Sequence, residues 1–163
     1  MRSAAPGAQC RGSAAKVQRM TDALPFNVNV AFDHLYGLVV TGVGDGEMRG
    51  MVAVRDEIKQ PAGLVHGGIY AAIAESLAST GTALAVMGDG NAALGLSNET
   101  SFLRPITAGT INAHARARHR GRTTWVWEVE CSDDAGRLCA LTRVTVAVRE
   151  APPEMLERAR EQG

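Results

Sequence analysis

Cysteine is scarce in this chain, which carries only Cys10, Cys131 and Cys139. The number is odd, and there is neither a Cys-x-x-Cys pair nor a paired histidine cluster, which argues against a disulfide framework and against a structural zinc site. We therefore expect reduced cysteines, no metal and no cofactor. A reducing, cytoplasmic setting fits this composition best.

An excess of charge of either sign is also missing, because 17 basic residues balance 17 acidic ones. Wholesale attraction to nucleic acid or to an anionic membrane therefore has no support, and any anion site must be local. No apolar run is expected to reach the length that spans a bilayer, and the N-terminus lacks the apolar core of a secretion signal. We expect a soluble protein with neither nucleic acid nor membrane as its partner.

The length of 163 residues, with 45% hydrophobic content, predicts a single core and a single domain. Residues 1–24 are rich in Ala, Gly, Ser and Arg and almost free of acids, so we expect a disordered leader, although a transit peptide has a similar composition. Residues 25–150 would form the domain. Residues 151–163 read as a charged tail with a short surface helix.

Hydrophobic patterns predict an α+β domain. Residues 36–56 read as a hairpin around a Gly-Asp-Gly turn, and residues 66–86 follow a helical period with Ile69, Ala72, Ile73, Leu77 and Leu84 on one stripe. Four antiparallel strands are expected in sequence over residues 92–149, separated by turn signals. We expect the sheet to wrap around the one long central helix.

Two glycines, Gly67 and Gly68, follow His66 where the predicted helix begins. One reading is an ordinary loop-to-helix junction, because glycine punctuates such junctions. The other is an oxyanion site, in which bare backbone N–H groups at a helix N-terminus bind developing negative charge. His66 could shape such a site or could cap a nearby backbone group.

Glu75 lies in the middle of this helix among alanines and leucines. A solvent-facing glutamate on an amphipathic helix is one interpretation. However, its face also carries Ala71, Ser79 and Thr82 in place of the Lys and Arg that a solvent-exposed face would have, so this face can admit a substrate.

Eight positions separate Gly67 from Glu75, a rise of about 12 Å, so one reacting carbon cannot touch both within one chain. We therefore expect a homodimer whose two helices share each active site.

The spacing of Gln60, His66-Gly67-Gly68, Glu75 and Ser79, followed by LSNETSFLRP and GRTTWVWEVECSDDAGRLCA, resembles the hotdog-fold acyl-CoA thioesterases. The likeness is to the Arthrobacter-type 4-hydroxybenzoyl-CoA and phenylacetic-acid-pathway group, and it runs from about residue 33 to residue 149. The resemblance implies a hotdog fold.

The same resemblance implies roles for individual residues. Gly67 would donate its N–H to the thioester carbonyl, Gln60 would contact the same oxygen, and Glu75 would act as nucleophile or general base. Ser79 keeps a hydroxyl that is commonly threonine in the family, and His66 has a secondary role. The predicted substrate-binding set consists of Asp33 near the aryl end, Gly68, Thr80 and Asn98. Thr80 stands where the hydroxybenzoyl enzymes can carry an acid, which weakens the case for that substrate.

Arginines gather at positions 116, 118, 120 and 122, within one strand and its turn. One interpretation is a solvent-exposed edge strand protected by charge, and another is a binding site for the phosphates of coenzyme A. The resemblance favours Arg104, Arg122 and Thr123 as the CoA-binding residues. A nucleic-acid surface is a further alternative, which a steep loss of affinity with salt would identify.

These observations predict an acyl-CoA thioesterase that converts an aryl-CoA thioester, of the hydroxybenzoyl, benzoyl or phenylacetyl kind, to the free acid and CoA. We expect a homo-oligomer, a dimer or a dimer of dimers. The alternative is a non-catalytic acyl-CoA-binding module that senses a ligand. A hotdog dehydratase or hydratase is disfavoured, because the sequence does not show the His with Asp or Asn motif that those enzymes carry.

Overall fold

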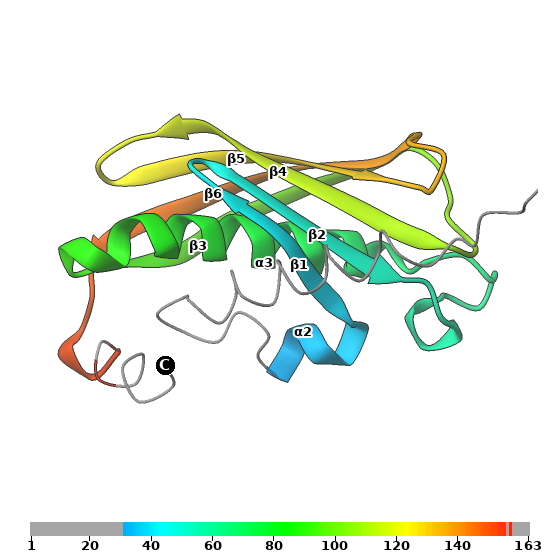
Figure 1. Ribbon diagram of the computed structural model, residues 1–163, viewed down its shortest axis with the longest axis horizontal. Coiled ribbons are helices and arrows are strands. Elements are labelled where there is room, and N and C mark those ends of the chain that lie inside the picture. The colour runs from blue at the N-terminus through cyan, green and yellow to red at the C-terminus, as the bar shows by residue number, and fades with distance from the viewer. Residues whose placement is uncertain (1–30, 156, 158–163) are drawn as a thin grey trace, which may run out of the picture.

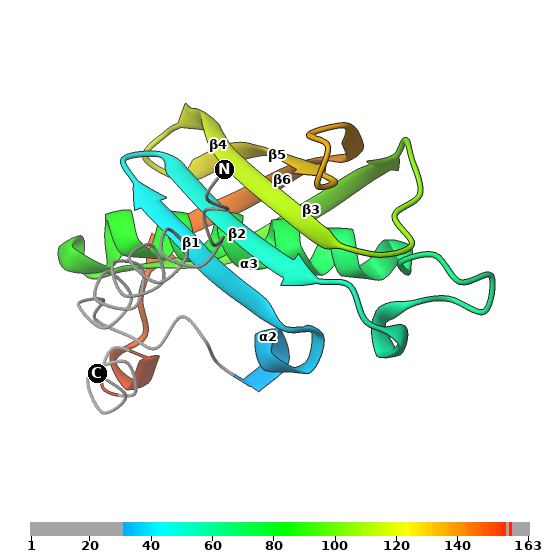
Figure 2. The same cartoon turned by 45° about the vertical axis from the view of Figure 1, so that its right-hand side comes forward.

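A six-stranded antiparallel sheet wraps around one long helix (Figures 1 and 2). The computed structural model describes residues 31–155 and 157, so the predicted leader over residues 1–24 lies outside the described residues. The elements are α2 (Ala31–Tyr36), β1 (Leu38–Gly44), β2 (Glu47–Ala53), η1 (Asp56–Ile58), α3 (Gly67–Val86), η2 (Met87–Asp89), β3 (Asn91–Phe102), β4 (Thr110–Arg120), β5 (Thr124–Ser132) and β6 (Leu138–Glu150). This arrangement confirms the predicted α+β class and the sheet wrapped around a central helix. In the tail, residues 153–155 and 157 are helical.

The strand order across the sheet is β1-β2-β4-β5-β6-β3. The predicted hairpin is confirmed as β1 and β2, and Gly46 takes a positive φ of 73° in its turn. The expectation of four strands paired in sequence needs a correction, because β3 pairs with β6 and has no pairing with β4. The strand that follows α3, β3, forms the edge of the sheet next to β6, whereas β4, β5 and β6 pair consecutively.

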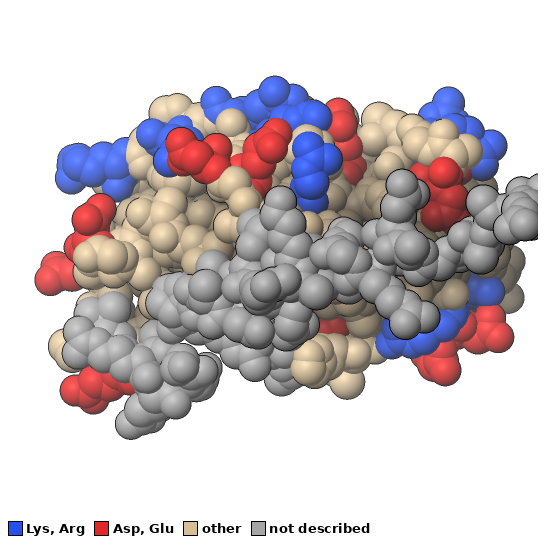
Figure 3. All heavy atoms as spheres, viewed as in Figure 1, with Lys and Arg blue, Asp and Glu red and all other residues tan. Residues whose placement is uncertain are grey.

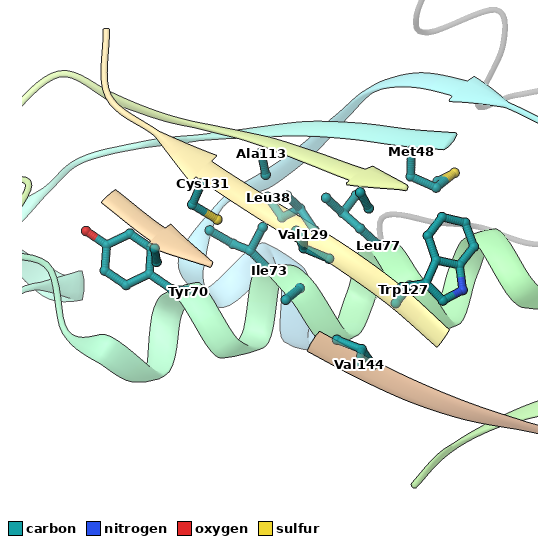
Figure 4. Close-up of a cluster of buried hydrophobic side chains, with 14 of the residues drawn as sticks. Leu38, Met48, Tyr70, Ile73, Leu77, Ala113, Trp127, Val129, Cys131 and Val144 are labelled. Carbon is teal, nitrogen blue, oxygen red and sulfur yellow. The ribbon is translucent and has the colours of Figure 1, made fainter. Parts of the chain in front are cut away.

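The core lies between α3 and the concave face of the sheet. Figure 4 shows Tyr70, Ile73 and Leu77 projecting from α3 toward the strand side chains, which include Val129 and the fully buried Trp127. Of the predicted stripe, Ile73 and Leu77 are fully buried, whereas Ile69, Ala72 and Leu84 are only partly buried. The buried face of α3 is therefore rotated about the helix axis relative to the predicted stripe, because the sheet covers α3 from one side.

The segment Gly67–Asp89, which is α3 with η2, contains an 18-residue window with a mean hydropathy of 1.3, so it is long and apolar enough to cross a membrane by length and composition. This corrects the expectation that no run reaches that length. In the fold, the same segment supplies the core helix, because Ile73, Leu77 and Ala78 are completely buried against the sheet.

The outer face of the sheet carries charges of alternating sign. The strand registers place Glu47, Arg116, Glu128, Arg143 and Glu99 opposite one another, in that order, across β2, β4, β5, β6 and β3. Figure 3 shows basic and acidic side chains side by side over the β4 and β5 side of the molecule. Opposite charges facing each other across strands contribute modestly to sheet stability.

Candidate active site

His66 caps the N-terminus of α3. Its Nδ1 accepts a hydrogen bond of 3.0 Å from the Gly68 N–H, which satisfies one of the orphan donors of the first turn. An accepting Nδ1 is unprotonated, so the ring proton lies on Nε2. The capping interpretation of His66 is therefore confirmed, and the predicted substrate contact through Gly68 would have to compete with this bond.

The N–H of Gly67 makes no hydrogen bond to any residue that the structure describes. A cavity of about 510 Å³ lies beside it, and its walls are Gln60, Leu64, Val65, Gly67, Tyr70, Phe102, Leu103, Arg104 and Pro105. The structure thus brings Gln60, Gly67 and Arg104 to one cavity, as expected for a carbonyl site beside a cation. An unpaired N–H at a helix N-terminus can stabilise an oxyanion.

Phe102 and Tyr70 are aromatic walls of this cavity that the sequence did not single out. The Phe102 ring lies over Gly67, where a Cβ would come within 2.8 Å of Cζ, so glycine permits this approach. The rings of Tyr70 and Phe102 are 6.1 Å apart. Burial raises the pKa of Tyr70 to about 12, so its hydroxyl stays protonated. The Tyr70 hydroxyl is buried and has no hydrogen-bond partner within the described part of the chain. The sequence has no signal for this, so only the structure shows it.

Glu75 lies two turns further along α3, and its half-buried carboxylate faces β3. Oε1 accepts a hydrogen bond of 3.1 Å from Ser79 Oγ, and Oε2 accepts one of 3.2 Å from Asn98 Nδ2. Gly95 packs directly on Oε1, leaving no space for a Cβ. A glycine inside a strand often marks such a close approach, so Gly95 carried a signal that sequence reasoning missed.

Glu75 is absent from the walls of the cavity that holds Gln60 and Gly67. Within one chain, therefore, the predicted catalytic residues form two groups. Gln60, in the loop before α3, and Gly67, the first residue of α3, form one group. Glu75 and Ser79, near the middle of α3 and beside the edge strand β3, form the other. This separation agrees with the rise of about 12 Å expected for eight helical residues.

Asp33 is buried against α3. Its Oδ1 accepts hydrogen bonds from the Tyr36 hydroxyl at 2.5 Å and from Ser76 Oγ at 2.7 Å. Burial, with the bond to Asp33, raises the pKa of Tyr36, so the phenol remains a donor. Asp33 thus contacts α3 through Ser76, the residue after Glu75. Thr80 is half-buried, and its hydroxyl has no hydrogen bond to a described residue.

The predicted CoA-binding residues lie at two places. Arg104 is at the cavity of Gly67 and also donates to the Leu138 carbonyl at 2.9 Å. Arg122 and Thr123 line a second cavity of about 660 Å³ together with Arg149, which donates to the Thr123 carbonyl at 2.8 Å. Both cavities offer cationic groups to an anionic ligand.

Three of the four clustered arginines are engaged with acids. Arg116 lies 3.6 Å from Glu47 and 3.5 Å from Glu130, Arg118 pairs with Glu128, and Arg120 lies 2.6 Å from Asp45. Their strand, β4, lies between β2 and β5, so the interpretation of a charged edge strand is wrong. Cross-strand pairing explains the charges instead.

Residues 31–155 hold no group of three or more His, Cys, Asp or Glu side chains that could bind a metal ion. Cys131 and Cys139 are free and buried. Burial raises the pKa of Cys131 to about 12, so this thiol is not a ready nucleophile.

Comparison with known proteins identifies the family of this chain. Residues 62–140 match the family described as the Thioesterase superfamily. The Mycobacterium tuberculosis protein Rv1847 is 38% identical over 131 residues, which is 79% of this chain and 94% of that protein. A 1,4-dihydroxy-2-naphthoyl-CoA hydrolase of Listeria monocytogenes is 32% identical over 70% of this chain and 92% of its own.

Solved structures give the same result. The Rv1847 structure superposes with a TM-score of 0.73 at 36% identity, covering 76% of this chain and 100% of that one. A mutant of the thioesterase PA1618 of Pseudomonas aeruginosa superposes with a TM-score of 0.72 at 29% identity, over 84% of this chain and 94% of its own. The chain therefore belongs to the thioesterase superfamily, and it is a thioester hydrolase with the hotdog fold.

Proposed function

We propose that this enzyme hydrolyses an aryl-CoA thioester in active sites shared between two copies of the chain. Gly67 N–H and the Gln60 side chain bind the thioester oxygen where charge develops. Glu75 of the other copy attacks the acyl carbon or takes a proton from the water that attacks it. The C–S bond then breaks, and CoA leaves as the thiol once protonated. When water attacks, the acid forms directly; when Glu75 attacks, water must then hydrolyse the acyl–Glu75 anhydride to release the acid and restore the carboxylate.

The observation that carries this proposal is the separation of the two halves of the site. The unpaired Gly67 N–H and Gln60 share a cavity to which Glu75 does not contribute, and the Glu75 carboxylate faces the edge strand of the sheet. One chain alone therefore supplies an oxyanion donor and a base at different places. Two antiparallel helices related by a two-fold axis would bring each donor to the other chain's base.

The edge strand β3 supports such a dimer. On its free side β3 has no strand partner within the described residues, and unpaired strand edges readily pair with another chain. Leu94 and Leu96 on this strand are 45% and 59% exposed. Pairing β3 with its copy would cover them and set Glu75 close to the interface. Whether two dimers then form a tetramer stays a prediction, as does the cytoplasmic location.

An aromatic acyl group fits the cavity beside Gly67, because Phe102 and Tyr70 offer ring faces and edges on which an aryl group packs. One relative bears the name of a naphthoyl-CoA hydrolase, which is an aryl thioesterase. Arg104, with Arg122 and Thr123 at the second cavity, would bind the phosphates of CoA. A ligand sensor without turnover is the alternative.

The test is thiol release by the purified full chain from benzoyl-, hydroxybenzoyl-, phenylacetyl- and straight-chain acyl-CoA. We expect turnover of all four classes, with the highest kcat/KM for an aryl thioester. A higher kcat/KM for the straight-chain esters would contradict the aryl assignment. Tight binding of one ester without any thiol release would support the sensor alternative.

A further inference from the structure

The carboxylate of Glu75 is the end of a chain of hydrogen bonds that starts on β6, continues on β3 and reaches α3. Thr100 Oγ1 donates to Asn98 Oδ1 at 3.1 Å, and the Thr100 and Thr142 hydroxyl oxygens are 3.0 Å apart. A hydroxyl has one proton, and that of Thr100 is used on Asn98. The fully buried Thr142 must therefore donate to Thr100. The donor-to-acceptor direction of these hydrogen bonds is thereby fixed, from Thr142 through Thr100 to Asn98.

Asn98 continues these hydrogen bonds, in the same donor-to-acceptor direction, to α3. Its Nδ2 donates to the Ala71 carbonyl at 3.0 Å and to Glu75 Oε2 at 3.2 Å. Both partners can only accept, so the amide nitrogen must face α3 while Oδ1 faces Thr100. Both amide protons are used in this arrangement. Asn98 therefore has no donor left for a substrate, in contrast to the role predicted from the sequence.

A bulge in β3 makes this contact possible. The pairing of β3 with β6 shifts register between Gly95 and Ser97, so Leu96 is an extra residue in the strand. Strict alternation would place Gly95, Ser97 and Glu99 on one face. With the extra residue, Gly95 and Asn98 both face Glu75, whereas Glu99 points to the outer face. Such bulges often redirect a side chain beside an active site.

We propose that Asn98 is a positioning residue for Glu75, and that Thr100 and Thr142 fix the orientation of its amide. This inference rests on the proposed function, in which Glu75 acts on the thioester. Each carboxylate oxygen receives one donor, Ser79 on Oε1 and Asn98 on Oε2, which holds the plane of the group. A second lone pair on each oxygen stays available for attack or for a proton.

The test separates positioning from binding and from folding. We expect Asn98→Ala and Thr100→Val to lower kcat on the order of tenfold to 10²-fold with little change in KM, because misplacing a reacting group costs such factors. Thr100→Ser keeps the hydroxyl and should keep most of the activity. Ser101→Ala is the matched control, since Ser101 is next on β3 and its hydroxyl has no hydrogen bond to a described residue.

A double-mutant cycle with Glu75→Gln gives the decisive comparison. If Asn98 acts through Glu75, Asn98→Ala should leave the residual kcat of Glu75→Gln unchanged. An equal fold-loss in both backgrounds would show a merely structural role and overturn the proposal. A rise in KM with kcat retained would restore Asn98 as a substrate contact and overturn it as well.

A second readout does not depend on turnover. In a crystal structure of the full chain, Glu75 should hold one rotamer in the unmutated protein and spread over several in Asn98→Ala. An unchanged single rotamer in Asn98→Ala would overturn the positioning role, even if no thioester were hydrolysed. Absence of thiol release by the unmutated protein, by contrast, would contradict only the proposed function.

Discussion

Gly95 of β3 lies directly against the carboxylate of Glu75 on α3, so that a Cβ at position 95 would overlap Oε1. The contact joins an edge strand to the middle of the core helix, and only the smallest residue permits it. Together with Ser79 and Asn98, Gly95 defines the space in which the carboxylate can lie.

The substitution Gly95→Ala should therefore displace Glu75. We expect kcat to fall on the order of 10²-fold while the protein stays folded, since a shift of about 1 Å in a reacting group has that effect. Steady-state kinetics and a thermal melt measure the two quantities. Gly88→Ala is the matched control, because a Cβ there meets nothing within 4 Å. Full activity of Gly95→Ala would show that the carboxylate has other productive positions.

Glu75→Gln keeps the size of the side chain and removes the base or nucleophile. We expect kcat to fall by on the order of 10² or more, with KM little changed, because the lost interaction acts in the transition state. The amide oxygen can still accept from Asn98 Nδ2 while the amide nitrogen donates to Ser79 Oγ, so the fold should persist. A variant with most of its kcat would remove Glu75 from the mechanism.

Arg104→Ala should act on binding more than on chemistry. Arg104 lines the same cavity as Gln60 and Gly67. A charge-assisted hydrogen bond to phosphate contributes about 1.5–3 kcal/mol, so its loss should raise KM for CoA esters about tenfold or more. Short thioesters that lack the nucleotide should be hydrolysed as before. Equal losses on both substrate types would instead assign Arg104 to its bond with the Leu138 carbonyl.

Mixing inactive chains tests the shared site. Glu75→Ala and Gln60→Ala chains are co-expressed so that they pair at random. If the donor and the base come from different copies, each mixed dimer has one intact site and one that has lost both groups. About half of the dimers are mixed, so activity should return to about a quarter of the unmutated level. No recovery in an isolated mixed dimer would mean that each site is built within one chain.

Gly81→Ala tests the packing of the core helix. A Cβ at this position would lie 2.7 Å from Trp127 Cη2 and 2.8 Å from Met48 Cγ. Overpacking costs about 1–3 kcal/mol, whereas alanine gains about 1 kcal/mol over glycine in a helix. We expect a net loss of about 1 kcal/mol in the free energy of unfolding, measured by denaturant titration. Ala85→Gly, at an exposed helical position, measures the propensity difference alone. A stabilised Gly81→Ala would show that Trp127 moves at no cost.

The sequence by itself determined the local elements. The Gly-Asp-Gly turn predicts the hairpin of β1 and β2, and the helical period after His66 predicts α3 over Gly67–Val86. The spacing of Gln60, Gly67 and Glu75 pointed to the thioesterases and to a site that one helix cannot complete. Each of these signals depends on residues close together in the chain, so turn chemistry and periodicity are enough to read them.

Only the tertiary structure decided which distant residues meet. The place of β3 beside β6, and the extra Leu96 that turns Asn98 toward Glu75, depend on a register between strands about 45 residues apart. The pairing of Arg116 with Glu47 likewise joins two strands far apart in sequence. A register is selected by the packing of whole faces against the helix, and one bulge reverses which side chains face inward. No local pattern records that choice, which is why Gly95 and Asn98 acquire their places at the site only in the folded chain.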